Sequence, residues 1–464
     1  MKKLLLGSTA LVAGGLMAAP AMAADPIKMG IGGYWTGYVI GGSIDSVYAL
    51  DGSTLDFKGI NLIYEGEIHF IGSTKLDNGT TVGVTVELEA WNPSQTSNGT
   101  ATVAASAQSA GAPLSQAGQI DESFLFAFGD WGRVEFGSRD PGAYRMFYGT
   151  PSALIGFGFS QHNHQWNAVG AANKSVRAGY GYNIGAQWQD ANRITYFTPR
   201  FAGLQVGVGY APKLQQQSAA GTLAGGGLAG SCGYNGGGNF GNCPNNYWQY
   251  QDEFDIGANY LNKFGAITIA LHAGFANATF NPGYRSNGGA SLITGANRAT
   301  WKQMVFGAQA GFAGFTFGGA FGVDNNGLGS NYYTGVDNDT RYWTLGGMYE
   351  TGPWQVSAGW GGAVNNNGNG SSFTCGFTSG TSVGNACAAA GTTGSTSIAF
   401  GTDPRYGALS FGSETTNKFE VGANYALGPG VKLVGGFMYY QIGGPSNATN
   451  GNSWAALMGM DLRF

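Results

Sequence analysis

The sequence predicts an all-β protein whose strands close into a transmembrane antiparallel β-barrel. Apolar residues alternate with polar residues or glycine in segments from Ile27 to Phe464. Charged residues make up only 10% of the chain, against about 25% in soluble domains. No apolar run of about 18 residues follows the N-terminal segment, so the sequence offers no spanning helix. A closed barrel is the other structure that satisfies its backbone hydrogen bonds in lipid.

The first 23 residues have the pattern of an export signal. Lys2 and Lys3 supply a positive start, Leu4–Met17 is an apolar run, and Ala21-Met22-Ala23 is a small-x-small cleavage signal. The apolar run is short for a bilayer core, which needs about 20 residues. We therefore expect residues 1–23 to be a signal peptide cleaved after Ala23, and the mature chain to leave the cytoplasm.

The charge balance argues against nucleic acid as a partner. The formal net charge is −4, and it becomes −6 when Lys2 and Lys3 leave with the signal peptide. No block of basic residues interrupts this mildly acidic chain, whereas proteins that bind nucleic acid usually carry one.

The connections separate a membrane barrel from a soluble sandwich, because both would show alternating strands. Tight turns alternate throughout with long stretches rich in Gly, Asn, Ser and Thr, as in outer-membrane barrels with short periplasmic turns and long external loops. The tight turns are Asp77-Asn78-Gly79, Asp130-Trp131-Gly132, Phe201-Ala202-Gly203, Lys263-Phe264-Gly265, Ala313-Gly314, Thr351-Gly352-Pro353 and Gly428-Pro429-Gly430. Four of the long stretches are Asn92–Ile120, Lys213–Gln251, Asn277–Thr300 and Asn365–Thr415.

This alternation predicts sixteen strands in a single barrel domain over residues 24–464. An even number lets the first and last strands pair antiparallel. Ser175–Gly185 also alternates and would raise the count to eighteen if it formed a hairpin in the wall. The expected strand centres are Gly33, Ile68, Thr85, Leu125, Glu135, Thr195, Val208, Ile256, Ile269, Gly307, Gly319, Leu345, Ser357, Val421, Gly435 and Met458.

The fifth long stretch, Asp140–Asn192, is expected to fold into the barrel as the third external loop. Unstructured loops longer than about 15 residues are uncommon in compact domains unless they are functional or disordered, and its many aromatic residues argue against disorder. These are Tyr144, Phe147, Tyr148, Phe157, Phe159, Trp166, Tyr180 and Tyr182.

Charged residues are predicted to line the pore around the start of this loop. Alternation places them on the polar faces of the second, third, fifth and sixth strands, and a charge facing lipid would cost about 2–4 kcal/mol near the midplane. The candidate constriction residues are Glu65, Glu67, Glu87, Glu89, Arg133, Glu135, Arg139, Asp140, Arg145 and Arg193. Such charges set the ion preference of a pore, and the slight excess of acids predicts weak cation preference. The alternative is that some only pair with one another or with loop backbone.

Aromatic residues near the expected strand ends predict a girdle at the membrane interfaces. The tryptophans assigned to it are Trp35, Trp91, Trp301, Trp343, Trp354, Trp360 and Trp454. The final strand has an outward apolar stripe at every second position from Trp454 to Phe464.

No catalytic, metal or nucleotide site is predicted, and no cofactor. His162 and His164 lack a nearby cysteine or carboxylate to complete a metal site. No nucleophile with a base and an orienting group stands out among the serines and four histidines. The glycines of Gly225–Gly230 lack the strand-to-helix context of a nucleotide loop.

The four cysteines predict two disulfides in external loops, Cys232–Cys243 and Cys375–Cys387, because an exported chain with an even cysteine count favours oxidation. Cross-linking between the two loops is the alternative.

Two segments resemble the Gram-negative trimeric general porin family, including its alphaproteobacterial and neisserial-like members. Residues 132–140 resemble the strand that leads into the constriction loop, and residues 192–204 resemble the strand, turn and strand that follow it. The terminal Phe464 resembles the residue that the barrel-assembly machinery reads in outer-membrane proteins. The Pro-Glu-Phe-Gly-Gly loop tip of enterobacterial members is absent, so the charges that face each other across the pore cannot be carried over.

The resemblance implies a homotrimer of water-filled channels in the outer membrane of a Gram-negative bacterium. These channels would pass small hydrophilic solutes by diffusion, in contact with lipid and lipopolysaccharide, and would catalyse no reaction. The alternatives are a substrate-selective channel and a structural or adhesin barrel, since the external loops are long.

Overall fold

The computed structural model describes residues 26–48, 54–90, 120–159, 190–214, 234–235, 239–240, 250–280, 300–325, 339–367, 412–443 and 451–464. In this part of the chain, no helix is long and apolar enough to cross a membrane. The predicted signal peptide, the four cysteines, Trp91 and the pair His162 and His164 lie outside the described residues.

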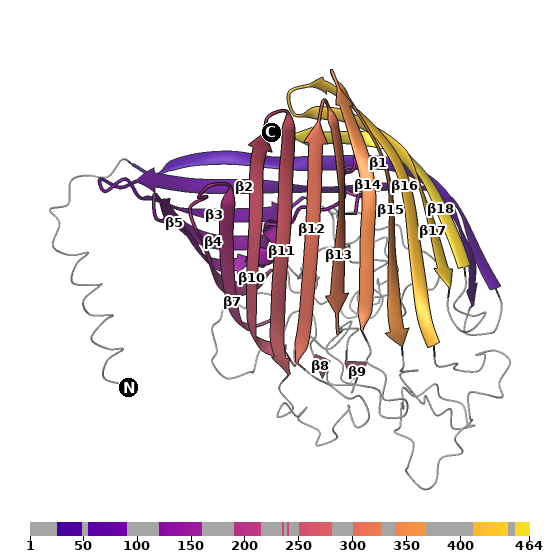
Figure 1. Cartoon of the computed structure of the whole chain (residues 1–464), viewed down its shortest axis with the longest axis horizontal. Coiled ribbons are helices and arrows are strands. Elements are labelled where there is room, and N and C mark those ends of the chain that lie inside the picture. The colour runs from indigo at the N-terminus through magenta and orange to yellow at the C-terminus, as the bar shows by residue number, and fades with distance from the viewer. Residues whose placement is uncertain are drawn as a thin grey trace, which may run out of the picture.

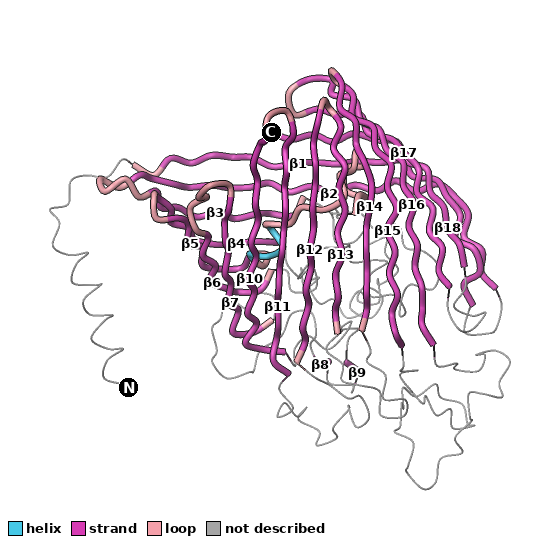
Figure 2. The backbone as a smooth tube through the Cα atoms, viewed as in Figure 1, coloured by secondary structure: helices cyan, strands magenta, loops and turns pink. Residues whose placement is uncertain are grey.

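The described residues form β-strands and one short helix on the inner side of the barrel (Figures 1 and 2). The elements are β1 (Lys28–Tyr48), β2 (Thr54–Lys75), β3 (Thr81–Glu89), β4 (Ile120–Gly129), β5 (Gly132–Arg139), α3 (Gly142–Arg145), β6 (Ala191–Phe197), β7 (Leu204–Lys213), β8 (Tyr234–Asn235), β9 (Asn239–Phe240), β10 (Tyr250–Phe264), β11 (Ile267–Phe280), β12 (Trp301–Phe312), β13 (Phe315–Asp324), β14 (Thr340–Thr351), β15 (Trp354–Asn367), β16 (Gly412–Gly428), β17 (Val431–Gly443) and β18 (Gly451–Arg463).

Sixteen of these strands close into an antiparallel barrel, in which β1 pairs with β18. Each predicted strand centre falls within one of them, so the sixteen-strand prediction is confirmed. Ser175–Gly185 lies outside the described residues, but β5 pairs directly with β6 from Arg133 to Arg139, and the ring closes without a further strand. The short strands β8 and β9 pair only with each other.

The predicted tight turns lie where the sequence placed them, at the seven hairpins that β2–β3, β4–β5, β6–β7, β10–β11, β12–β13, β14–β15 and β16–β17 form. At Ala202-Gly203 and Ala313-Gly314, φ is positive at both residues, as the type I′ turn of a two-residue hairpin requires. Some strands are longer than predicted: β11 runs past Asn277, β15 past Asn365, and β16 starts before Thr415. Asn, Ser and Thr are typical of loops, but their backbones still form strand hydrogen bonds beyond the apolar band of the barrel.

The wall is apolar outside, while its inner face carries the polar side chains. On β6, for example, Ile194 and Tyr196 are exposed, whereas Arg193 and Thr195 are buried inside. Exposed tryptophans of the predicted girdle include Trp35, Trp354, Trp360 and Trp454.

Trp301 is an exception, and its assignment to the girdle is wrong. It is 2% exposed, and its indole Nε1 donates a hydrogen bond to Asp324 Oδ1 at 2.6 Å. The alternation of β12 decides this, because Lys302 and Met304 are exposed and the intervening residues face inward. A residue at the first position of a strand takes its face from the register, which sequence position alone did not reveal.

Candidate functional site

The first part of the predicted inward loop starts at the end of β5 and lies on the inner wall. Helix α3 contacts β6, β7, β10 and β11. The backbone N–H of Ala143 donates a hydrogen bond to Asp255 Oδ1 at 2.7 Å, and Asn259 Nδ2 donates one to the carbonyl of Met146 at 3.2 Å. His272 Nδ1 lies 3.1 Å from the same carbonyl. Strands β10 and β11 therefore hold the start of the loop.

The loop then follows the inner wall from β12 to β16. Gln309 of β12 donates a hydrogen bond to the carbonyl of Gly149 at 2.7 Å. Ala153 is held by two strands: its N–H donates to Ser357 Oγ of β15 at 2.8 Å, and its carbonyl accepts from Asn424 Nδ2 of β16 at 3.0 Å. These contacts place the described residues 140–159 on the inner face of the barrel wall.

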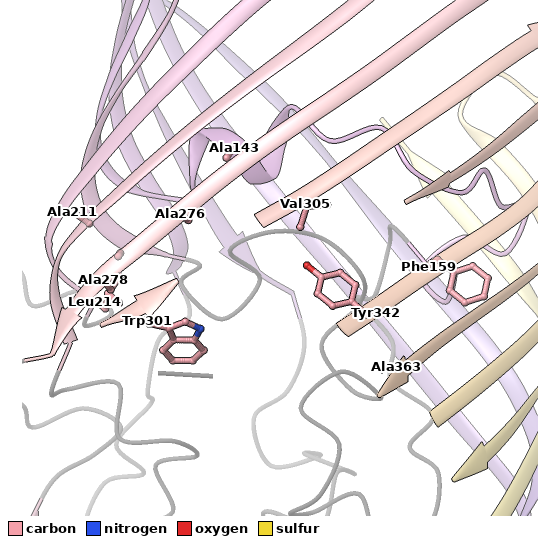
Figure 3. Packing of buried hydrophobic residues seen from close by; sticks show 11 residues of the cluster. Ala143, Phe159, Ala211, Leu214, Ala276, Ala278, Trp301, Val305, Tyr342 and Ala363 are labelled. Atoms are coloured by element: carbon pink, nitrogen blue, oxygen red, sulfur yellow. The ribbon is translucent and has the colours of Figure 1, made fainter. Parts of the chain in front are cut away.

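The far end of the described loop is anchored on β1 and β16. Tyr38 donates a hydrogen bond to the carbonyl of Ile155 at 2.8 Å, and the Lys418 ammonium donates one to the carbonyl of Phe157. The same ammonium pairs with Glu420 at 2.8 Å and lies 4.6 Å from the ring centre of Phe159. Figure 3 shows Phe159 and Ala143, two loop residues of one buried hydrophobic cluster that extends along the inner wall.

Glycines on the inner face of the wall make room for the loop. A Cβ at Gly257 would lie 2.8 Å from Ala143 Cα, one at Gly422 would lie 2.5 Å from Leu154 Cγ, and one at Gly307 would overlap the carbonyl oxygen of Tyr148. Further glycines with equally close loop atoms are Gly207, Gly318, Gly346, Gly359, Gly361 and Gly436. These inward-facing glycines thus form a glycine track, from β7 to β17, on which the loop packs.

The arginines near the loop start are neutralised by carboxylates. Arg139 pairs with Glu87 at 3.0 Å and also with Glu122. Arg133 and Arg145 share one partner, because each has a nitrogen 2.6 Å from an oxygen of Glu135.

Arg193 forms the most buried of these ion pairs. Its Nη1 lies 2.9 Å from Glu253 and 3.3 Å from Asp255, and its Nε donates a hydrogen bond to the carbonyl of Arg139 at 2.6 Å. The guanidinium therefore connects β6 to β10 and to the end of β5, where the loop begins.

A second group of acids lies on β2, β3 and β4, beside the arginine cluster. Tyr34 donates hydrogen bonds to Glu65 and Glu67, and His69 Nε2 lies 2.8 Å from Glu67. Carboxylate oxygens of Glu67, Glu89 and Asp121 lie within 4.8 Å of one another.

Neighbouring carboxylates could in principle hold a cation. Besides the set just described, Glu67 groups with His69 and Glu87, and Glu122 groups with Asp140 and Asp190. His69 pairs with Glu67, however, and Glu87 and Glu122 both pair with Arg139. We assign no metal to these groups.

A β-bulge brings two acids to the site that alternation does not predict. Val86 pairs with Ser123, but Leu88 pairs with Ile120, so β4 has one residue more than β3 at this point. Such a bulge lets successive side chains face the same side. In this way both side chains face the inner wall. Asp121 lies near Glu67 and Glu89 there, and Glu122 pairs with Arg139.

Burial changes the titration of Asp140, which lies in the loop directly after β5. Loss of water raises the pKa of its carboxyl to about 6, although the charges of Arg139, Arg145 and Arg193 act in the opposite direction. Its backbone N–H donates a hydrogen bond to Glu122 Oε1 at 2.9 Å.

The structure thus brings the ten predicted charged residues to one part of the wall, on β2, β3, β5, β6 and the loop start. Sequence reasoning missed Asp121, Glu122, Glu253 and Asp255. The last two alternate with outward Phe254 and Ile256, and this signal could have identified them. It also missed the loop anchors Lys418 and Glu420, although both are on the polar face of an alternating strand.

Solved structures similar to this chain include an outer membrane protein and two porins. A loop deletion mutant of OmpT, an outer membrane protein of Vibrio cholerae, has a TM-score of 0.50 at 10% identity, covering 95% of this chain and 100% of that chain. An anion-selective porin from Comamonas acidovorans has 0.49 at 13% identity, and a mutant Rh. blastica porin 0.44 at 15%; each comparison covers 94% of this chain and 100% of the other. No curated protein matches the chain in sequence.

The family comparison covers nearly the whole length. The family model described as Gram-negative porin matches residues 7–444. Family and fold are those of channels, and both agree with a closed barrel that has an apolar outside and a charged inside. The chain belongs to the Gram-negative porin family and is a diffusion channel of the outer membrane.

Proposed function

We propose that residues 140–159 and the charged cluster at their start form the constriction of a general diffusion channel for small hydrophilic solutes and ions. The observation that carries this proposal is the path of the loop, which hydrogen bonds tie to β10, β12, β15, β16 and β1 in turn. A segment that lies along the inner wall reduces the open cross-section and brings charges beside the solute path.

Single-channel recording in planar bilayers tests this function. A general diffusion channel gives conductance that rises with salt concentration and is not blocked by individual sugars or peptides. Saturable block by one solute would favour the substrate-selective alternative instead. A folded barrel without open-channel conductance would favour a structural or adhesin barrel.

We infer weak cation preference for this channel. Each arginine of the cluster has at least one carboxylate partner, whereas the second group of acids adds negative charge on β2 to β4. The reversal potential under a salt gradient measures this preference, and a reversal potential of anion-selective sign contradicts it.

A homotrimer fits the uneven height of the wall. Strands β5 and β6 have 8 and 7 residues, fewer than the 9–11 or so that a tilted strand needs to cross a bilayer. Protein rather than lipid would cover this side. Cross-linking of the barrel purified in mild detergent should yield trimers, and monomers alone would contradict this assembly.

The remaining proposals concern the processing of the chain, its assembly into the membrane and its contact with lipopolysaccharide. We propose that the signal peptide is cleaved after Ala23, that the barrel-assembly machinery reads Phe464, and that lipopolysaccharide phosphates contact the outer rim. Lys302 and Arg341 are exposed on the outward face near the loop ends of β12 and β14, where they can meet anionic headgroups. Mass spectrometry of the mature N-terminus tests the cleavage position.

A further inference from the structure

Three phenylalanines form a row on the inner face of β4, where the lining of a water-filled barrel is usually polar. Phe124, Phe126 and Phe128 occupy alternate positions, and neighbouring ring centres are 6.5 Å and 6.0 Å apart. Phe124 and Phe126 are nevertheless only 4% and 8% exposed. Other side chains therefore cover these rings, and those side chains are the arginines of the proposed constriction.

Three guanidinium groups of the constriction, those of Arg133, Arg139 and Arg145, lie over aromatic rings. The Cζ of Arg139 is 4.4 Å from the ring centre of Phe124, and that of Arg133 is 4.7 Å from Phe126 and 5.6 Å from Phe128. A separate ring on β6 repeats the arrangement.

That ring is Phe197, whose centre lies 4.8 Å from the Cζ of Arg145. In the β5–β6 register, Phe197 is directly opposite Arg133. The four phenyl rings that lie near guanidinium groups thus come from two strands, β4 and β6, one on each side of β5.

Glycines make room for the rings of β4. A Cβ at Gly83, across from Phe126 on β3, would overlap that ring. One at Gly137, across from Phe124 on β5, would lie 2.6 Å from Phe124 Cα. A larger residue at Gly83 would displace the ring on which Arg133 lies, and one at Gly137 would displace the backbone that carries Phe124.

The faces and edges of the guanidinium groups have different partners. A planar guanidinium can stack on a ring through its face while its edge N–H groups donate to carboxylates. Here the N–H groups meet Glu87, Glu122 and Glu135, while each Cζ lies over a phenyl ring. Both contacts hold the positive charges against the wall.

We propose that Phe124 and Phe126 are positioning residues for ion selection. They keep Arg139 and Arg133 against the wall, so that the carboxylates of β2 and β3 determine the field along the solute path. This inference rests on the proposed function, because it specifies how the constriction obtains its cation preference. The two rings contact arginines and not the permeating ion.

The test compares Phe124→Leu/Phe126→Leu with the wild-type channel, since leucine keeps most of the apolar volume without a π face. The ratio of K⁺ to Cl⁻ permeability is expected to fall about two- to fivefold, the factor by which loss of a cation–π contact changes the stacked population. Phe124→Ala/Phe126→Ala should shift it further in the same direction. Phe306→Leu, on the outward face, is the control and should leave the ratio unchanged.

A second pair of substitutions, in the arginines, separates the positioning role of the two phenylalanines from their role in packing. In Arg133→Gln/Arg139→Gln, the leucine substitutions should no longer change the permeability ratio, because their effect acts through the arginines. A persistent shift in that background, or a wild-type ratio in the leucine variant, would overturn the proposal.

Chemical modification gives a readout that does not depend on conductance. Phenylglyoxal should modify Arg133 and Arg139 about two- to fivefold faster in the leucine variant than in wild type, as followed by peptide mass spectrometry. Equal rates would overturn the positioning role even if the wild-type barrel proved to conduct no ions. Absence of conductance with faster modification would instead contradict only the proposed channel function.

Discussion

The two walls joined by the loop differ on both of their faces. The sector from β2 to β6 carries the ion pairs inside and includes the shortest barrel strands, β5 and β6. The sector from β14 to β18 has strands of 12 to 17 residues. Its outer face carries aromatic contacts, such as Trp360 with Phe419 and Phe437 with Trp454, at 6.3 Å and 6.1 Å between ring centres.

Inside the tall sector, the wall is mainly apolar and glycine-rich, and its buried charges include the Lys418–Glu420 pair that holds the loop. Leu154 and Phe157 of the loop pack in a buried cluster with Tyr38, Met438 and Leu457. The inner face of a porin wall thus need not be uniform. In this barrel one sector carries the charges of the proposed constriction, and the other holds the described part of the loop. The following predictions separate these two roles.

Lys418→Met should have the largest effect, because it removes a contact that holds the loop on the inner wall. The change leaves Glu420 buried without its cation, and breaking such a pair costs about 3–5 kcal/mol. The thermal unfolding midpoint should fall and the open-channel current should become noisier. Lys418→Met/Glu420→Leu, which removes both charges, should recover much of the loss; a double variant no more stable than the single one would contradict this reasoning.

Gly307→Ala should disturb the packing of the loop on the inner wall by a smaller amount. The added Cβ meets the carbonyl of Tyr148, and overpacking of this kind typically costs about 1–3 kcal/mol. Gly41→Ala is the matched control, because its Cβ would approach no atom closer than 3.7 Å. Equal unfolding midpoints for the two variants would show that the loop does not depend on the glycine track.

Replacing Arg133, Arg139 and Arg145 together by glutamine should change the charged sector while the sector that holds the loop remains intact. One unit charge about 8 Å away contributes about 0.5 kcal/mol in water, so three charges favour cations by up to about tenfold before screening by salt. Reversal potentials in planar bilayers measure the shift. Unchanged potentials would contradict the assignment of these arginines to the constriction.

Acid should produce the smallest effect, through Asp140. Because its carboxyl has a raised pKa of about 6, it is ionised at pH 7.5 and mostly protonated at pH 5, so the negative charge is lost as pH falls. Cation preference should decrease by about twofold, the contribution of one charge at about 8 Å. In Asp140→Asn this part of the pH dependence should disappear, and an identical pH profile would exclude Asp140 as its source.

Sequence reasoning reached the site because period-2 alternation assigns each charged side chain to a face. Glu65, Glu67, Glu87 and Glu89 were identified in this way. It missed Asp121 and Glu122 because a bulge breaks the alternation locally. The sequence of β17 does indicate the apolar inner wall. Inward Val434 and Met438 alternate there with outward apolar residues, and this pattern indicates burial on both faces.

The sequence by itself determined the barrel, its sixteen strands and the tight turns, because each depends on local alternation and on turn chemistry within a few residues. Only the tertiary structure decided which carboxylate pairs with which arginine, that Trp301 faces inward, and where the loop packs. These features depend on the register of strands distant in the chain and on the space that glycines leave opposite the loop. Alternation along a strand decides whether a side chain faces the lumen or the lipid. The pairing of distant strands in the closed barrel decides which other side chain it meets there.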